Sequence, residues 1–169
     1  MFEELYALAI LYAGGFDTGK QYQNLMNKMT LEGREDILEL QYLPMRDAVV
    51  RTMFMAENGT PFDMEVFGRY LMRHLQETCE GKSLNFIGKR LYTLWKGLPG
   101  YLQYEYPFEF LIYADDEAAL CSEGHISEKQ GRIWFEDVFN YYDNGGIIRP
   151  GITVLSQLCY AREHPELYS

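Results

Sequence analysis

The sequence predicts a mainly α protein, folded as a single compact helical domain of about six to eight helices over residues 1–169. Three observations support this prediction. Apolar residues recur at three- and four-residue steps through most of the chain. Serine, threonine or aspartate precedes these stretches, and glycine or proline follows them, as helix boundaries require. A length of 169 residues with 47% hydrophobic residues is enough for one full-sized core.

The N-terminal part of the chain shows helical spacing most clearly. Residues 2–12 carry one apolar face, and two glycines at 14–15 supply a stop. Thr18 and Gln21 fit a capping box at the start of a second helix, in which each side chain accepts a hydrogen bond from the other residue's backbone N–H. Residues 30–43 suit a helix by one spacing and a strand by another, and we favour the helix.

In the rest of the chain, four individual residues mark the starts of helices. Pro44 suits the first turn of a helix that the Asn-Gly pair at 58–59 ends. Asp63, Ser83 and Ser127 each precede an apolar stretch and suit the N-cap position, where a side-chain oxygen accepts from a free backbone N–H. Each of these residues is therefore expected to begin a helix.

The segment near 98–123 is the least regular part of the sequence. Pro99 and Pro107 interrupt an aromatic-rich run there, so we expect loop, short strand or irregular packing. Residues 150–162 form the last expected helix. No internal repeat and no linker long enough to separate two domains is present.

The net charge of −10 is unevenly distributed along the chain. Residues 66–100 lean basic, with six basic and two acidic side chains. Residues 101–145 carry ten acidic and two basic side chains, a net charge of −8, together with eleven aromatic residues. An ordinary core with a solvated face explains this composition, and so does a protein-binding surface.

The cysteines and the apolar stretches predict a cytoplasmic protein without a membrane segment. Cys79, Cys121 and Cys159 are odd in number and far apart, as reduced and mostly buried thiols are. The longest apolar stretch, residues 5–13, is too short to cross a bilayer. Two glutamates precede it at the place where a secretory signal carries positive charge.

One segment fits most of a phosphate-binding pattern. Residues 14–20, GGFDTGK, begin with Gly14 and end with Lys20, and match the first seven positions of GxxxxGK[ST]. Gln21 stands where the pattern has the hydroxyl residue that binds magnesium, and the preceding spacing is helical rather than strand-like. A capping box at the start of a helix explains the same residues without a ligand.

A second segment ends in a pair of carboxylates. Residues 110–116, FLIYADD, resemble the apolar strand that ends in a magnesium-binding acid in nucleotide hydrolases, and the YADD box of reverse transcriptases. Both patterns use carboxylates to hold a hard divalent cation, which here implies Asp115 and Asp116. Capping of a short helix by either aspartate is the plainer interpretation. No family resemblance extends over the chain.

Each cysteine has a histidine nearby in the sequence, but no close pair such as CxxC is present. A zinc site assembled from Cys121, His125 and Cys159 is one interpretation, and buried thiols with partly exposed imidazoles are the other. No GxSxG, HExxH or dinucleotide-binding motif is present. We therefore expect a binding protein without a cofactor or a metal rather than an enzyme.

Our main functional hypothesis is an acidic protein-binding module that docks on a basic partner. Aromatic side chains anchor interfaces, and a local charge of −8 steers a basic partner, such as a nuclease or other nucleic-acid-binding protein. Inhibitors of the anti-CRISPR or anti-restriction type, from phages and mobile elements, share this charge and size. The expected contact residues are Tyr104, Glu105, Tyr106, Glu109, Asp115, Asp116 and Glu117.

Three alternatives remain open at this stage. A magnesium-dependent nucleotide or phosphate enzyme would use the segment from Gly14 to Lys20 together with Asp115 and Asp116. A homodimer would pair the basic stretch of one copy with the acidic stretch of another. Direct binding of nucleic acid is the third and weakest alternative: no direct DNA binding is expected, because the overall charge opposes contact with phosphates, but the basic stretch alone could still touch RNA.

Overall fold

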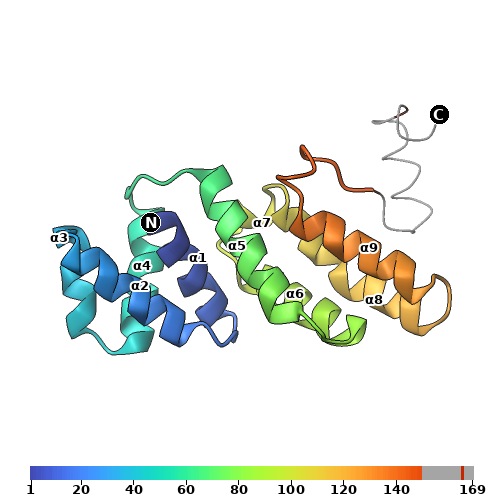
Figure 1. Ribbon diagram of the computed structural model, residues 1–169, viewed down its shortest axis with the longest axis horizontal. Coiled ribbons are helices and arrows are strands. Elements are labelled where there is room, and N and C mark those ends of the chain that lie inside the picture. The colour runs from blue at the N-terminus through green and yellow to red at the C-terminus, as the bar shows by residue number, and fades with distance from the viewer. Residues whose placement is uncertain (150–164, 166–169) are drawn as a thin grey trace. The chain divides into compact units, whose positions relative to one another are not determined.

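The computed structural model describes residues 1–149 and 165, and every regular element within them is a helix (Figure 1). This confirms the mainly α fold class. The structure has more helices than expected because it contains short ones, such as α3 (Glu35–Leu38) and α7 (Gly100–Gln103), of four residues each. The expected helix at 150–162 lies outside the described residues. In chain order the elements are α1 (Phe2–Ala13), α2 (Gly19–Leu31), α3 (Glu35–Leu38), the 3₁₀-helix η1 (Glu39–Tyr42), α4 (Met45–Glu57), α5 (Met64–Cys79), α6 (Leu84–Gly97), α7 (Gly100–Gln103), the 3₁₀-helix η2 (Phe108–Tyr113), α8 (Ala114–Ser122) and α9 (Glu128–Phe139).

The contacts of the chain fall into two compact units, Met1–Thr78 and Cys79–Ser169. We call them the first and the second unit. The expectation of a single domain over 1–169 stays a prediction.

The first unit is built around α1. Every residue of α1 from Leu5 to Leu11 is buried, which is the pattern of a central helix covered on all sides. The helices α2 and α4 pack against it. The Tyr6 ring stacks on the Phe67 ring of α5 at 4.8 Å between centroids and meets the Phe62 ring edge-on at 5.3 Å. Aromatic packing therefore joins α1 to the start of α5.

Thr18 corrects one sequence-based expectation. It precedes α2, but its side chain makes no cap hydrogen bond, so the expected capping box with Gln21 is absent. The Thr18 hydroxyl instead donates to the carbonyl of Leu8 in α1 at 3.0 Å, in a buried position. The Thr18 backbone has φ −111° and ψ 4° rather than the extended conformation of an N-cap, so its hydroxyl binds α1.

The other expected helix starts are confirmed. The backbone N–H of Val66 donates to the Asp63 carboxylate at 2.9 Å, and that of Phe86 donates to the Ser83 hydroxyl at 3.3 Å. Ser127 forms a complete capping box with Gln130 at the start of α9. These signals are local, because both partners of each hydrogen bond lie within three residues of one another.

Residues 30–43 are helical, as favoured, but they do not form one helix. The helix α2 ends at Leu31, Gly33 has a positive φ of 86°, and α3 and η1 follow. A left-handed residue cannot continue a right-handed helix, so Gly33 divides the segment.

The second unit depends on a close crossing of α6 and α8. A Cβ atom added to Gly88 would lie 2.6 Å from the carbonyl oxygen of Ala114 and 2.6 Å from the Cβ of Ala118. The helix α9 packs on α8 in turn, where Gly131 faces the Sγ of Cys121. Figure 1 shows these helices side by side. Small residues therefore determine how closely the helices approach.

The segment near 98–123 is irregular, as expected, and within it the structure contains no strand. The short α7 is followed by a cis peptide bond between Tyr106 and Pro107, and then by η2 and α8. The Trp95 indole N–H donates to the carbonyl of Gln103 at 3.1 Å, and the Gln103 amide donates to the carbonyl of Trp95 at 3.1 Å. This reciprocal pair joins the end of α6 to α7.

Replacing Gly88 with alanine should destabilise the second unit by roughly 1–3 kcal/mol, because the new methyl group meets a backbone carbonyl that has no room to move. Gly97 is the matched control on the same helix, since an added Cβ there meets nothing within 4 Å. Gly97→Ala should be neutral or stabilise by up to about 1 kcal/mol. Both tryptophans, Trp95 and Trp134, belong to the second unit, so urea unfolding followed by tryptophan fluorescence reports on it. Equal effects of the two substitutions would contradict the close crossing.

A buried hydrogen-bond chain in the first unit predicts a loss of stability at high pH. The Thr52 hydroxyl donates to the carbonyl of Ala48 at 3.0 Å, so the Tyr22 hydroxyl, 2.7 Å away, donates to Thr52. Burial raises the pKa of Tyr22 from 10.0 to about 12. Between these two values the unfolded chain releases the proton and the folded chain retains it. The stability that the protonated Tyr22 contributes is therefore fully present below about pH 10. It is lost as the pH rises towards 12, which lowers the free energy of unfolding by on the order of 2 kcal/mol.

Tyr22→Phe should weaken this pH dependence while lowering stability at neutral pH by about 1 kcal/mol, the worth of a buried hydrogen bond. Unfolding in urea, followed by circular dichroism at several pH values, measures both effects. Tyr42→Phe is the control, because Tyr42 is 81% exposed. This substitution should leave the change of unfolding free energy with pH as it is in the wild type. An identical slope in wild type and Tyr22→Phe would show that Tyr22 does not cause the loss.

Candidate protein-binding surface

The expected contact residues belong to the second unit, between α7 and the first turn of α8. Six of the seven reach the outside of the unit to different degrees. We call these six the acidic aromatic surface: Tyr104, Glu105, Tyr106, Glu109, Asp115 and Asp116.

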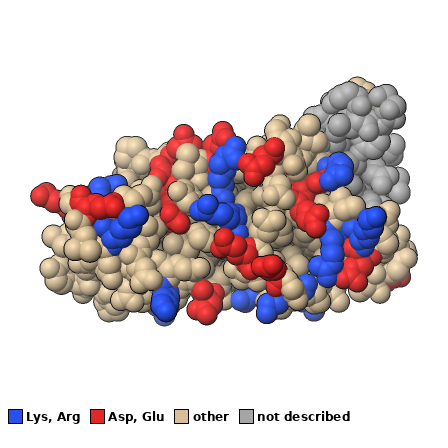
Figure 2. Space-filling view, in the orientation of Figure 1, with Lys and Arg blue, Asp and Glu red and all other residues tan. Residues whose placement is uncertain are grey.

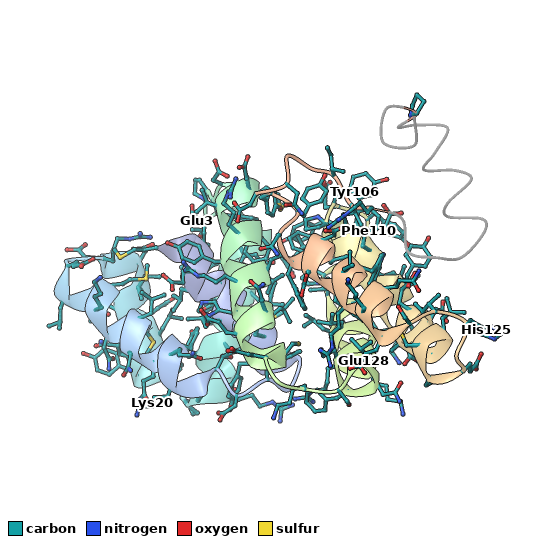
Figure 3. The ribbon with its side chains drawn as sticks, turned by 45° about the vertical axis from the view of Figure 1, so that its right-hand side comes forward. Glu3, Lys20, Tyr106, Phe110, His125 and Glu128 are labelled. Carbon is teal, nitrogen blue, oxygen red and sulfur yellow. The ribbon has the colours of Figure 1, made fainter. Side chains whose placement is uncertain are left out.

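The aromatic part of this surface is held by ring contacts. Tyr104 and Tyr106 are 75% and 56% exposed. The Tyr106 ring stacks on Phe110 at 5.1 Å between centroids, and both rings lie 6.5 Å from Tyr141, which follows α9. Figure 3 shows Tyr106 and Phe110 beside each other. Tyr106 therefore presents an ordered ring to a partner, which lowers the entropy lost on binding.

The acidic part consists of four carboxylates. Glu105 and Glu109 lie one turn apart, and the backbone N–H of Glu109 donates to the carbonyl of Glu105 at 3.0 Å. Asp115 and Asp116 lie in the first turn of α8, where the positive end of the helix dipole favours negative charge. Glu105 and Asp116 are exposed, and the other two are half-buried.

Among the described residues, none of these four carboxylates forms an ion pair, whereas others in the same unit do. Glu128 pairs with Arg132 at 2.6 Å. The buried Asp137 pairs with Arg149 at 2.7 Å. A paired carboxylate has little field at a distance, whereas the four carboxylates of the acidic aromatic surface keep their charge for other molecules. On the face drawn in Figure 2, acidic and basic side chains are interspersed rather than collected into one large field.

Glu117 is only 3% exposed and does not belong to the surface. Phe108, Leu111 and Ala114 are buried at three-residue steps, the period of a 3₁₀-helix, and Glu117 continues that row. Its sequence neighbours Asp115 and Asp116 lie outside this row. The prediction that Glu117 is a contact residue was based on its position next to Asp115 and Asp116, and it did not take the three-residue period into account.

Two further exposed tyrosines were not among the expected contact residues. Tyr101 in α7 is 42% exposed, and Tyr113 at the end of η2 is 51% exposed. Tyr113 follows Phe110 by three residues and therefore lies on the same row of η2. The buried row at Phe108 and Leu111 repeats every three residues, and Tyr113 lies outside that row, which is the signal that identifies it as exposed.

The segment that fits the phosphate-binding pattern joins two helices in the first unit. Gly14 and Lys20 lie between the end of α1 and the first turn of α2, with no strand before them, and Lys20 is exposed. Asp115 and Asp116 belong to the second unit. The hypothesis that these residues act together on a nucleotide or phosphate stays a prediction.

The cysteines and histidines do not form a metal site within the described part of the chain. Cys121 is half-buried, its thiol donates to the carbonyl of Ser127 at 3.7 Å, and burial raises its pKa. His125 is exposed, 3.4 Å from the Glu123 carboxylate, and Figure 3 shows it well apart from Tyr106. Cys159 lies outside the described residues. Cys79 is buried, and burial raises its pKa to about 11, which makes it a poor nucleophile.

Comparisons of the chain with family models, with curated proteins and with solved structures give no match. Within residues 1–149, no helix combines the length and the apolar character that a membrane span needs.

Proposed function

We propose that this protein is a non-enzymatic binding module whose acidic aromatic surface docks on a basic protein that handles nucleic acid. The observation that carries the proposal is a group of four carboxylates that form no ion pair among the described residues, on the segment 104–116 that also carries the exposed rings of Tyr104 and Tyr106. Carboxylates without an internal partner can pair with arginine and lysine of another protein, and tyrosine is an interface anchor.

Occupation of a nuclease or of another nucleic-acid-binding protein at its basic surface would block the entry of DNA or RNA. Inhibitors of the anti-restriction and anti-CRISPR type, from phages and mobile elements, are the analogy, on grounds of charge and size. An inhibitor of this kind needs no cofactor, because its effect comes from covering the partner's surface.

A quadruple charge reversal tests the acidic part. Glu105→Lys, Glu109→Lys, Asp115→Lys and Asp116→Lys together should weaken binding of the partner by about 100-fold or more, because like charges then face each other. The natural host's lysate supplies the basic proteins, with capture at low and at high salt and mass spectrometry of the retained species. A specific basic protein should be retained by the wild type at low salt, released at high salt, and lost by the variant.

The matched control carries the same change of net charge on the first unit. Asp17, Glu35, Asp47 and Glu57 are exposed, form no ion pair among the described residues, and are replaced with lysine together. Circular dichroism establishes that both variants are folded. Retention of the same basic proteins by the surface variant and the control would overturn the proposal.

The tyrosines should act on a different step of binding. Tyr104→Ala and Tyr106→Ala should raise the dissociation rate of the captured partner by roughly 10- to 100-fold, while leaving the association rate and its salt dependence almost unchanged. The charge reversals should instead slow association and flatten its salt dependence. Surface plasmon resonance at several salt concentrations separates the two effects, and tyrosine variants with wild-type dissociation rates would remove the rings from the interface.

A further inference from the structure

The outer face of α6 is the cationic counterpart of the acidic aromatic surface. Residues 81–104 contain four basic residues and no aspartate or glutamate. In α6 the spacing of Phe86, Lys89, Thr93 and Lys96 places them on one face, and all four are exposed. Lys82 precedes the helix, and its ammonium lies 5.7 Å from the centroid of the Phe86 ring. We call Lys82, Phe86, Lys89, Thr93 and Lys96 the cationic face.

The lysines of this face form no ion pair among the described residues, although arginines of the same unit do. Arg132 and Arg149 pair with carboxylates at 2.6 and 2.7 Å. The Lys82 ammonium is instead held beside the Phe86 ring, and the Lys96 ammonium lies 4.8 Å from the Tyr92 ring centroid. Contact with an aromatic ring orients a lysine without neutralising its charge. Lys82 and Lys96 are therefore oriented by rings, and the three lysines of the face have no carboxylate partner among the described residues.

We propose that the cationic face of one copy binds the acidic aromatic surface of a second copy. Both surfaces belong to the second unit and carry opposite charges without ion pairs among the described residues. Both also expose aromatic rings, since Phe86 is 40% exposed. The proposal rests on the proposed function in one respect, because self-association covers the surface that the basic partner would use.

A second copy suits the cationic face better than a nucleic acid does. A polyanion approaching α6 meets a chain of net charge −10 that includes four unpaired carboxylates on the same unit. A second copy brings its carboxylates to the lysines and its lysines to the carboxylates. At about 0.15 M salt the screening length is about 8 Å, so repulsion between the two net charges is weakened while contact pairs remain.

The contact joins two unlike surfaces, which limits the assemblies that it can form. It either occurs twice in a closed two-fold dimer or repeats head to tail, as a closed ring or an open chain of copies. In both assemblies each acidic aromatic surface engaged in the contact is covered. The basic partner and the second copy therefore compete for one site.

Complementary charge reversal tests the contact directly. One variant carries Lys82→Glu, Lys89→Glu and Lys96→Glu; the other carries Glu105→Lys, Glu109→Lys, Asp115→Lys and Asp116→Lys. Sedimentation velocity at about 0.15 M and at about 1 M salt should show salt-sensitive association of the wild type, with at least a tenfold weaker affinity at about 1 M, where the screening length falls to about 3 Å. Each variant alone should be monomeric, and an equimolar mixture of the two should associate again.

A matched control carries the same charge change on cations outside the face. Lys20, Arg46 and Lys129 are exposed, form no ion pair among the described residues, and are replaced together with glutamate. This control should associate like the wild type. If the glutamate variant loses its helical circular dichroism signal, a milder variant with Lys82→Gln, Lys89→Gln and Lys96→Gln takes its place. This variant should associate at least tenfold more weakly than the wild type.

Three results would overturn the proposal: a wild type that stays monomeric at all concentrations, association of the cationic-face variant equal to that of the control, or no association in the mixture. Polyuridylic acid is the competing probe, measured by fluorescence anisotropy. Tight binding of this RNA that is lost in the cationic-face variant, with a monomeric wild type, would assign the face to nucleic acid instead.

The cationic-face variant also separates this proposal from the proposed function. It retains the whole acidic aromatic surface, so its capture of a basic host protein depends on the proposed function alone. Capture by a monomeric variant that exceeds capture by the self-associated wild type supports both proposals. Complementary association without any captured partner would support self-association and reject the docking function.

Discussion

The close approach of α6 to α8 at Gly88 is the constraint on which the second unit depends. Because Gly88 has no side chain, the carbonyl of Ala114 and the methyl group of Ala118 lie directly against α6. The buried row that begins at Phe108 and Leu111 therefore faces the interior, together with Ala114. On the other side of η2, Tyr113 is exposed and Glu109 is half-buried, and the outer face of α6 is exposed. The two charged surfaces thus lie outside the contact made at Gly88.

Ion pairing separates the charges of the two surfaces from several other charges of the second unit. The stretch from 101 to 145 is acidic as a whole, but Glu128 and Asp137 are neutralised by arginines. The carboxylates near η2 and the lysines of α6 have no such partners among the described residues. An internal ion pair uses up the attraction that a charge could offer to another molecule. The unpaired groups are the ones that remain available for recognition.

Both proposals place binding on the acidic aromatic surface, so the basic partner and the second copy would compete for it. If both proposals hold, the surface that binds a basic protein also binds the cationic face of a second copy. Self-association would then reduce the free concentration of the binding surface until a partner of higher affinity displaces the second copy. The Tyr106 ring, packed on Phe110, would serve either proposed partner without rearrangement.

The sequence alone determined the helical class, most helix boundaries and the position of the irregular segment. Asp63, Ser83 and Ser127 were identifiable as helix starts because the hydrogen bonds that they accept are local. Tertiary structure decided the role of Thr18, whose hydroxyl binds the carbonyl of Leu8 across ten residues of chain. It also decided that Glu117 is buried. Which charges are neutralised depends on contacts such as that between Asp137 and Arg149, and residue spacing does not encode such long-range contacts.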